Sequence, residues 1–298
     1  MNWKEKLISL YLYISESSEM KNYLRGIRKS NNSLLDFTDE EALTVYLYGI
    51  LQNPCKVKEI YLYAMDHLRD WFPKLPSYQA FDNRINTIAG AFAIMATELI
   101  KKEVEILDFT QESILDTMPI LVAGSKRSSS ACVAKDICGK GYCSSKDMYY
   151  YGLKLHLIGF VRPGTIPMPE SCFVTDAKEN DLTYARPLLE LIYNRKIYAD
   201  KIYMDTDFNR QLQKNNNTII ITPVKKQRGQ LLEDAADNLF SKAVSEIRQP
   251  IESFFNWLNE KTQIQNATKT RSSKGLMAHV WGKIAAAFCL LSKSIFNP

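Results

Sequence analysis

The pattern of apolar residues changes near Glu105, and this change limits the fold more than any other feature of the sequence. Before that point, apolar residues recur at helical spacing in segments such as FTDEEALTVYLYGILQ, where Thr38 and Glu41 are placed as a capping box. After it, short runs of β-branched and aromatic residues alternate with helical segments. The chain is therefore expected to form a helical N-terminal domain over residues 1–105 and an α/β domain over residues 106–298.

Five strands are expected in the second part. They lie in ILDTMPILVAG from Ile114, MYYYGLKLHLIGF from Met148, ESCFVTDA from Glu170, KIYADKIY from Lys196 and TIIITPV from Thr218. A helix over 181–193 separates the third strand from the fourth, a helical turn separates the fourth from the fifth, and two helices follow, over 231–261 and from Gly275. This order predicts a mixed five-stranded sheet flanked by helices, in the α+β or α/β class.

Charge is unevenly distributed along the 298 residues, which carry a formal net charge of +5. No acidic residue follows Glu260, whereas six lysines and arginines do. A basic surface of this kind fits a polyanionic partner such as DNA. A solvated, lysine-rich tail is the alternative interpretation.

The six cysteines include no CxxC pair. Free thiols in a reduced intracellular protein are the simplest interpretation. A zinc-binding module that uses Cys132, Cys138, Cys143 and His156 is an alternative, but these spacings are looser than those of known zinc sites.

The most hydrophobic segment is GLMAHVWGKIAAAFCLLSKSIF, and His279 and Lys283 interrupt it. A lysine near the middle is unusual for a membrane span, so a core helix is expected. The N-terminal segment MNWKEKLISLYLYISE has charges within its apolar stretch and does not look like a signal peptide. No membrane association is expected.

Three acidic residues occupy positions that suit metal-dependent chemistry. Asp116 lies in the first strand, Asp200 lies in the fourth, and Glu252 lies on the helix expected over 231–261. A carboxylate in an apolar strand is costly unless it lies at the strand end or binds a cation. Two divalent cations held by such carboxylates can clamp the attacking and leaving oxygens of a phosphodiester. For Glu252, the alternative is a surface ion pair with Arg248, four residues earlier.

Several segments together resemble the DDE transposases of bacterial insertion sequences, whose catalytic domain has an RNase H-like fold. The resemblance covers most of the chain and is carried by ILDTMP, GYCSSKDMYYYGLKLHLI, FVTDAKENDL, YADKIY, IIITPVKKQR and RQPIESFFNWL. LPSYQAFDNRIN in the helical part is similar to the region that precedes such domains. The specific element is the order of a strand aspartate, a second strand aspartate and a helix glutamate.

The resemblance implies that Asp116, Asp200 and Glu252 are the catalytic triad and bind Mg²⁺ or Mn²⁺, as two ions. It also implies that Arg248 contacts DNA or orients a carboxylate. Asp205 and Asp207 are rivals for the second carboxylate, although MDTDFNRQL is more typical of a helix start that Asp205 or Thr206 caps.

Three positions depart from the family pattern: Ser245 replaces a tyrosine, Asn259 replaces a lysine and Ile202 replaces a glycine. These departures concern the outer DNA contacts more than the triad.

Basic residues outside the triad are candidates for contact with the DNA backbone. Those assigned to this role, besides Arg248, are Lys126, Arg127, Lys154, Lys201, Lys225, Lys226 and Arg84. Lys135, Lys140 and Lys146 lie in the same segment as the first two, and a solvated loop is the alternative for this group. Arg84 lies near the start of a helix that would suit a helix-turn-helix reader of DNA, although any helical bundle produces this pattern.

The resemblance implies metal-dependent cleavage of DNA at insertion-sequence ends and strand transfer to a target. The partners are then double-stranded DNA and, because two ends must be joined, a second copy of the chain in a homodimer. The expected location is the bacterial cytoplasm, at the nucleoid. The alternatives are an RNase H-like nuclease without strand transfer and a non-catalytic DNA-binding relic or repressor.

Overall fold

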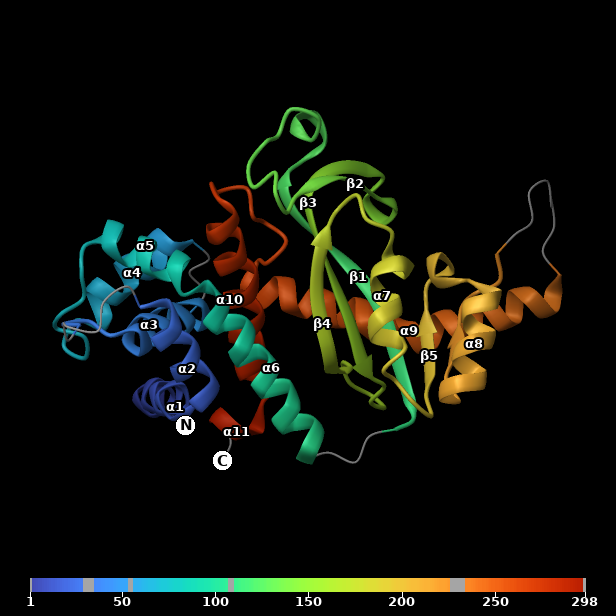
Figure 1. The fold of residues 1–298 in the computed structure, drawn as a ribbon, viewed down its shortest axis with the longest axis horizontal. Coiled ribbons are helices and arrows are strands. Elements are labelled where there is room, and N and C mark those ends of the chain that lie inside the picture. The colour runs from blue at the N-terminus through green and yellow to red at the C-terminus, as the bar shows by residue number, and fades with distance from the viewer. Residues whose placement is uncertain (1, 29–34, 53–55, 107–109, 226–233, 297–298) are drawn as a thin grey trace. The chain divides into compact units, whose positions relative to one another are not determined.

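The computed structural model describes residues 2–28, 35–52, 56–106, 110–225 and 234–296 (Figure 1). The chain divides into two compact units. The first contains Met1–Ile106, Cys132–Asp136 and Leu258–Pro298, and the second contains Leu107–Ala131 and Ile137–Trp257. This grouping differs from the expected ranges 1–105 and 106–298 at the C-terminal end, because the last helices pack with the N-terminal ones. The division into two folding domains stays a prediction.

The first unit is helical. Its helices are α1 (Trp3–Glu16), α2 (Ser18–Ile27), α3 (Asp39–Leu51), α4 (Val57–His67), α5 (Tyr78–Thr87), α6 (Ala89–Ile106), α10 (Ser273–Leu291) and α11 (Lys293–Phe296). The capping box predicted at Thr38 and Glu41 is present at the start of α3. Ser77 caps α5 by accepting a hydrogen bond from the backbone N–H of Ala80. Local sequence signals therefore locate these helix starts.

Helix α10 forms part of the core of this unit. It contacts α3, α5 and α6. By length and composition it could cross a membrane, but 61% of its apolar stretch is buried within the protein. Lys283, only 1% exposed, donates a hydrogen bond from Nζ to the backbone carbonyl of Gln263 at 3.2 Å. These contacts agree with the predicted core helix.

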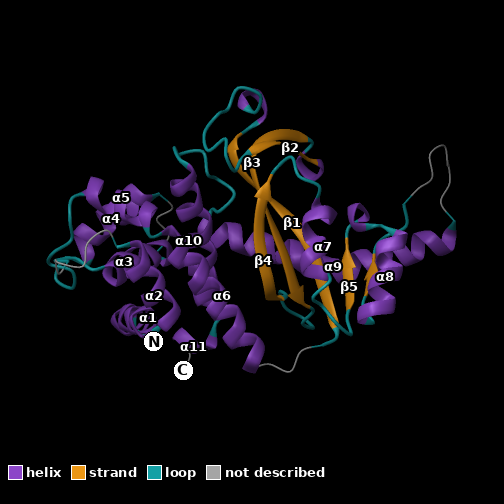
Figure 2. Cartoon of the chain, viewed as in Figure 1, coloured by secondary structure: helices purple, strands orange, loops and turns teal. Residues whose placement is uncertain are grey.

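The second unit contains a six-stranded mixed sheet, shown in orange in Figure 2. Its strands are β1 (Glu112–Ala123), β2 (Gly139–Cys143), β3 (Met148–Phe160), β4 (Met168–Asp176), β5 (Lys196–Ala199) and β6 (Ile219–Ile221). The order is β2-β3-β1-β5-β6, and β4 also pairs with β3. Strands β1, β2, β3 and β4 pair antiparallel, whereas β5 pairs parallel with β1 and β6. This arrangement, with its flanking helices, confirms the predicted RNase H-like fold class.

Two details of the predicted sheet are wrong. The sheet has a sixth strand, β2, whose sequence GKGYC has two glycines and no β-branched residue and therefore gives little strand signal. Strand β5 ends at Ala199, and residues 201–203 form the short 3₁₀ helix η3 (Lys201–Tyr203). Asp200 therefore lies at the end of the strand and not inside it, because the chain turns there to place Tyr203 in the core.

The helices of the second unit are α7 (Asp181–Leu189), α8 (Thr206–Asn216) and α9 (Ala235–Thr262), with the 3₁₀ turns η1 (Ser125–Arg127) and η2 (Ser144–Lys146). Asn180 caps α7 by accepting a hydrogen bond from the backbone N–H of Thr183. Helix α9 continues through Pro250 without the restart that this proline suggests. Helix α9 ends at Thr262, and the first unit begins again at Leu258, so the last turn of α9 belongs to the first unit.

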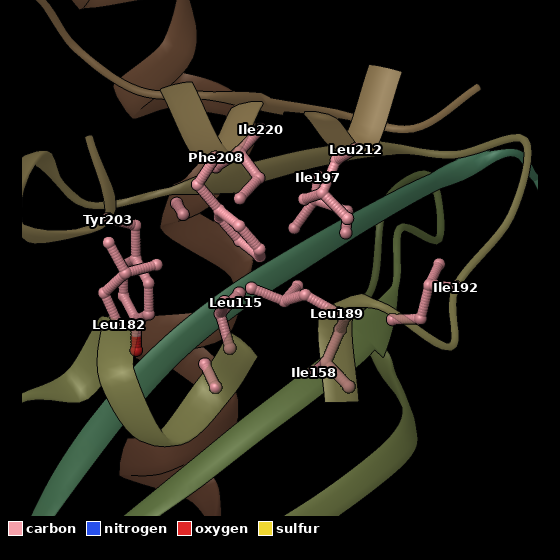
Figure 3. Packing of buried hydrophobic residues seen from close by; sticks show 12 residues of the cluster. Leu115, Ile158, Leu182, Leu189, Ile192, Ile197, Tyr203, Phe208, Leu212 and Ile220 are labelled. Atoms are coloured by element: carbon pink, nitrogen blue, oxygen red, sulfur yellow. The ribbon is translucent and has the colours of Figure 1, made fainter. Parts of the chain in front are cut away.

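The two faces of the sheet have different neighbours. Figure 3 shows the core on one face, where Leu115 of β1, Ile197 of β5 and Ile220 of β6 meet Leu189 of α7 and Phe208 of α8. Side chains alternate along a strand, so the residues that follow Leu115 and Ala199 point to the other face. In Figures 1 and 2, α7 lies in front of the sheet and α9 passes behind it. Asp116 and Asp200 are therefore placed toward α9.

Candidate active site

Two aspartates and one arginine form the centre of the candidate site. Leu115 of β1 pairs with Ala199 of β5 in parallel register, so Asp116 and Asp200 are the next residues on neighbouring strands. From α9, Nη2 of Arg248 lies 3.0 Å from Oδ2 of Asp116. Nη1 of the same guanidinium lies 3.6 Å from Oδ1 of Asp200. One cation therefore joins both carboxylates.

The two carboxylates lie in different environments. The side chain of Asp116 is 20% exposed, and that of Asp200 is 50% exposed. Burial raises the pKa of Asp116 to about 6; the charge of Arg248 and the N–H donated by Thr117 oppose this shift, whereas Asp200 adds to it. Asp116 thus resists ionisation unless a cation is close.

Arg248 is itself held in a polar environment that is only partly satisfied. Its Nε is buried and has no hydrogen-bond partner among the described residues. An unpaired buried donor costs free energy, so its position is maintained by the two ion pairs and by the packing of α9. Arg248 was predicted to contact DNA or orient a carboxylate, and the second role agrees with this geometry.

Glu252 lies outside the group formed by Asp116, Asp200 and Arg248. It is exposed on α9, one turn after Arg248. In the part of the chain that the structure describes, no group of three His, Cys, Asp or Glu side chains is placed to hold a metal ion. The alternative, an ion pair between Arg248 and Glu252, does not form among the described residues, because Arg248 pairs with Asp116 and Asp200 instead. The structure therefore brings together two of the three predicted acids.

The donor set can be compared with the needs of a divalent cation. Mg²⁺ prefers hard oxygen ligands and keeps several waters, so one or two carboxylates suffice to bind it. Asp116 and Asp200 supply such oxygens on rigid elements and already share one positive group. The pair fits a divalent cation, and Glu252 is the candidate for a third ligand.

The other face of β1 carries a buried ion pair that the sequence did not reveal. Nζ of Lys154 lies 2.6 Å from Oδ1 of Asp181 and donates a second hydrogen bond to the backbone carbonyl of Glu179. Thr117 donates to Oδ2 of the same aspartate at 3.4 Å. Lys154 was assigned to the DNA backbone, but here it holds the start of α7 against β3. The only signal for Asp181 was its position at a helix start.

Beside this pair, His156 is a sheet residue, as predicted. It is fully buried, stacks on Phe173 with ring centroids 4.4 Å apart, and its Nε2 lies 2.8 Å from the hydroxyl of Thr175. Burial lowers its pKa to about 4. A neutral imidazole in this position is structural.

Tyr203 is a second residue that sequence reasoning missed. It follows Asp200 by three residues, and Figure 3 shows its ring beside Leu182 in the core. Its hydroxyl is buried without a hydrogen-bond partner in the described chain. Burial, followed by the charges of Asp181, Asp116 and Asp200, raises its pKa well above the ordinary value. The pattern KIYADKIY predicted a strand residue there and could not show the turn.

The remaining predicted cations are dispersed. Lys126, Arg127, Lys201 and Lys225 are exposed, and Lys226 lies outside the described residues. Arg84 belongs to the first unit, where its Nη1 lies 2.6 Å from Oδ1 of the buried Asp39. Exposed side chains can reach a phosphate, whereas Arg84 would have to leave a carboxylate to do so.

The rival residues have other roles in the structure. Asp205 caps α8 by accepting from the N–H of Phe208 and forms an ion pair with Arg186, as the helix-start interpretation predicts. Asp207 is exposed beside Arg210. The described cysteines, which exclude Cys55, are not joined in disulfides, and none belongs to a group of metal-ligating residues.

The mixed sheet with its flanking helices has the architecture of an RNase H-like domain. A sequence model described as transposase DDE domain matches residues 108–273, which is more than half of the chain. The chain therefore belongs to the transposase DDE domain family, whose members act on DNA and use divalent metal ions. No curated protein and no solved structure matches the sequence.

Proposed function

We propose that this protein is a DNA transposase of a bacterial insertion sequence that cuts the ends of its element and joins them to a target. The observation that carries the proposal is the pair Asp116 and Asp200, which directly follow the paired residues Leu115 and Ala199 and are bridged by one cationic group. Family membership supports the same chemistry. Double-stranded DNA is the substrate, and a homodimer on DNA, in the bacterial cytoplasm, would hold two ends together.

In this mechanism Asp116, Asp200 and Glu252 would hold Mg²⁺ or Mn²⁺, as two ions. The ions would supply Lewis-acid stabilisation and a template for in-line attack on the phosphodiester. Asp116 and Asp200 are positioned by the ends of the paired segments of β1 and β5, whereas Glu252 is exposed on α9, one turn after Arg248. Arg248 orients the two aspartates and offsets part of their negative charge before DNA arrives. Exposed Lys126, Arg127, Lys201 and Lys225, with Lys226, would position the DNA backbone.

A labelled duplex with the end of the element tests this proposal. In Mg²⁺ or Mn²⁺, the parent protein is expected to nick the duplex and transfer the 3′ end to a second DNA, and Asp200→Ala is expected to abolish both steps. Equal activity in Asp200→Ala would exclude Asp200 from the mechanism and favour Asp205. Asp207→Ala, an exposed aspartate on the neighbouring helix, is the matched control and is expected to keep activity.

One observation favours a second candidate function, a non-catalytic DNA-binding protein that acts as a repressor. Glu252 is exposed and no three-acid group forms within the described residues. This candidate predicts DNA binding without cleavage in either metal, and an Asp116→Ala variant that behaves as the parent does. Cleavage without joining would instead indicate an RNase H-like nuclease.

A further inference from the structure

The hairpin of β2 and β3 carries an exposed aromatic pair. Tyr142 and Tyr149 are directly paired across the two strands, and their ring centroids are 5.1 Å apart. Tyr142 is 49% exposed and Tyr149 is 55% exposed. Two large aromatic rings that remain this exposed on one small hairpin are unusual for a surface without a partner.

The opposite face of the hairpin is the one that stabilises it. Cys143 and Tyr150 are buried there against Ala177, with Leu121 and Met148 packed beside them. The hairpin is thus held from one side, and alternation leaves Lys140, Tyr142 and Tyr149 on the other. A cross-strand aromatic pair adds only about 0.2–1 kcal/mol to a hairpin, and it does not require rings that stay half exposed.

A lysine lies over one of the two rings, and a basic turn lies beside the hairpin. Nζ of Lys140 lies 4.8 Å from the ring centroid of Tyr149 and donates a hydrogen bond to the hydroxyl of Ser129 at 2.9 Å. Ser129 follows η1, which contacts β3 and carries the exposed Lys126 and Arg127. One acidic residue, Asp147, is nearby and accepts a hydrogen bond from the hydroxyl of Tyr142.

Rings with basic residues around them match one kind of partner. Aromatic side chains stack on nucleic-acid bases of any sequence, and lysine and arginine follow the phosphates. In a duplex, the base faces are covered by their neighbours, so the rings can stack only on an unpaired or extruded base. We propose that the surface formed by Lys126, Arg127, Lys140, Tyr142 and Tyr149, here called the hairpin platform, binds unpaired bases of the DNA substrate.

The platform lies on the same face of the sheet as the candidate active site. Asp116 pairs with Leu157 of β3, and Tyr149 lies an even number of residues before Leu157, so both side chains face the same way. From Leu157, the partner of Asp116, to Tyr149, strand β3 spans eight residues, or about 26 Å. This length corresponds to about eight nucleotides at 3.4 Å each. On the proposed function, which this step presupposes, the platform would hold an unpaired base about eight nucleotides from the scissile phosphate.

Binding to fluorescent oligo(dT) in EDTA tests the platform without any cleavage. The parent is expected to bind oligo(dT), and Tyr149→Ala is expected to weaken binding by about fivefold or more, since each stacked base contributes at least about that factor. Tyr142→Phe/Tyr149→Phe keeps both rings and is expected to keep the affinity. Lys140→Ala is expected to lower the dependence of log K on log salt by about 0.7.

Two controls make the result specific. Tyr193→Ala removes an exposed tyrosine near the opposite end of the sheet, before β5, and is expected to bind as the parent does. In oligo(dT) with one 2-aminopurine, emission is expected to be quenched by the parent and by the phenylalanine variant, but less by Tyr149→Ala. This second measurement decides the question if the alanine variant is poorly folded.

Failure of the platform and failure of the proposed function give different results. Equal oligo(dT) affinity of the parent and Tyr149→Ala, or no oligo(dT) binding by the parent, would overturn the platform while leaving metal-dependent cleavage untouched. Asp116→Asn/Asp200→Asn is expected to lose cleavage and to keep oligo(dT) binding. Binding to oligo(dT) that depends on Tyr149 supports the platform even if no cleavage is found.

Discussion

At the scale of single residues, Arg248 lies between Asp116 and Asp200 and pairs with both carboxylates. Its guanidinium contacts one oxygen of each carboxylate. The charge of Arg248 lowers the pKa of Asp116 and so opposes the effect of burial on that carboxyl group. A divalent cation held by these two carboxylates, as proposed above, would have to share their oxygens with Arg248.

Arg248→Gln is therefore expected to bind Mn²⁺ more tightly than the parent, by about tenfold if one competing ion pair of about 1.4 kcal/mol is removed. The measurement is Mn²⁺ titration by calorimetry or electron paramagnetic resonance. Arg248→Lys keeps the charge and is expected to lie near the parent. Weaker Mn²⁺ binding by Arg248→Gln would mean that Arg248 mainly holds the carboxylates in a binding geometry.

Lys154 is expected to matter for stability even without DNA. Lys154→Met leaves Asp181 buried and without its cation, and breaking one side of a buried ion pair costs about 3 kcal/mol. Urea denaturation of the DNA-free protein measures this loss. Lys126→Met, at an exposed position, is the matched control and is expected to unfold as the parent does. An unchanged midpoint for Lys154→Met would return Lys154 to the set of free DNA-binding cations.

The residues show how far the sequence could go. Asp116 and Asp200 could be singled out because a carboxylate in an apolar β-type segment is costly to bury without a cation. In the structure, both lie on the face of the sheet opposite Leu115 and Ala199. Lys154 could not be assigned, because its partner Asp181 comes from a helix start 27 residues away. Glu252 lies on the expected helix, but a helical wheel does not say how that helix approaches the sheet.

At the scale of elements, β3 is buried on both sides along most of its length. His156 lies in it beside Thr175 of β4, and Asp181 and Lys154 face the same region. Its pKa of about 4 in the folded state is below the ordinary value of 6.5. The unfolded chain therefore binds a proton between pH 6.5 and pH 4 that the folded chain does not.

The contribution of His156 to the free energy of unfolding is therefore expected to be fully present above pH 6.5. It is expected to decrease as the pH falls toward 4, by at most about 1.4 kcal/mol per pH unit. His156→Phe removes the proton and keeps a ring against Phe173, so its unfolding free energy is expected to depend less on pH in this window. Urea denaturation at several pH values measures the two slopes. Identical slopes would show that His156 is already charged in the folded protein or becomes accessible to solvent.

Helix starts were the most predictable features, because capping residues such as Thr38, Ser77, Asn180 and Asp205 carry local signals. The end of β5 and the short strand β2 were not predictable. Tyrosine and isoleucine continue after Asp200 as they would in a strand, and only tertiary packing of Tyr203 ends it.

At the scale of the whole molecule, the C-terminal segment belongs to the unit that contains the N-terminal helices. The sequence shows only that this segment follows the strands, and it could not show that the segment packs with the N-terminal helices. In α10, the side chains of Leu276, Val280, Ile284 and Ala285 are almost completely buried, at 1% exposure or less. Apolar burial of this extent stabilises by about 1.5–3 kcal/mol for each large side chain, so the first unit depends on a segment distant in sequence.

A chain that ends at Trp257 tests this dependence. It lacks α10 and α11, so the N-terminal helices would expose the surfaces of α3, α5 and α6 that α10 covers. Limited proteolysis is expected to cut the N-terminal helices rapidly and to leave the sheet of residues 110–225 protected for longer. Ala285→Asp in the full chain, which buries a charge in the same core, is expected to give the same pattern. Equal protection of the N-terminal helices in the shortened chain would show that they form a stable core without α10, and that the predicted boundary near residue 105 separates two independent folding units.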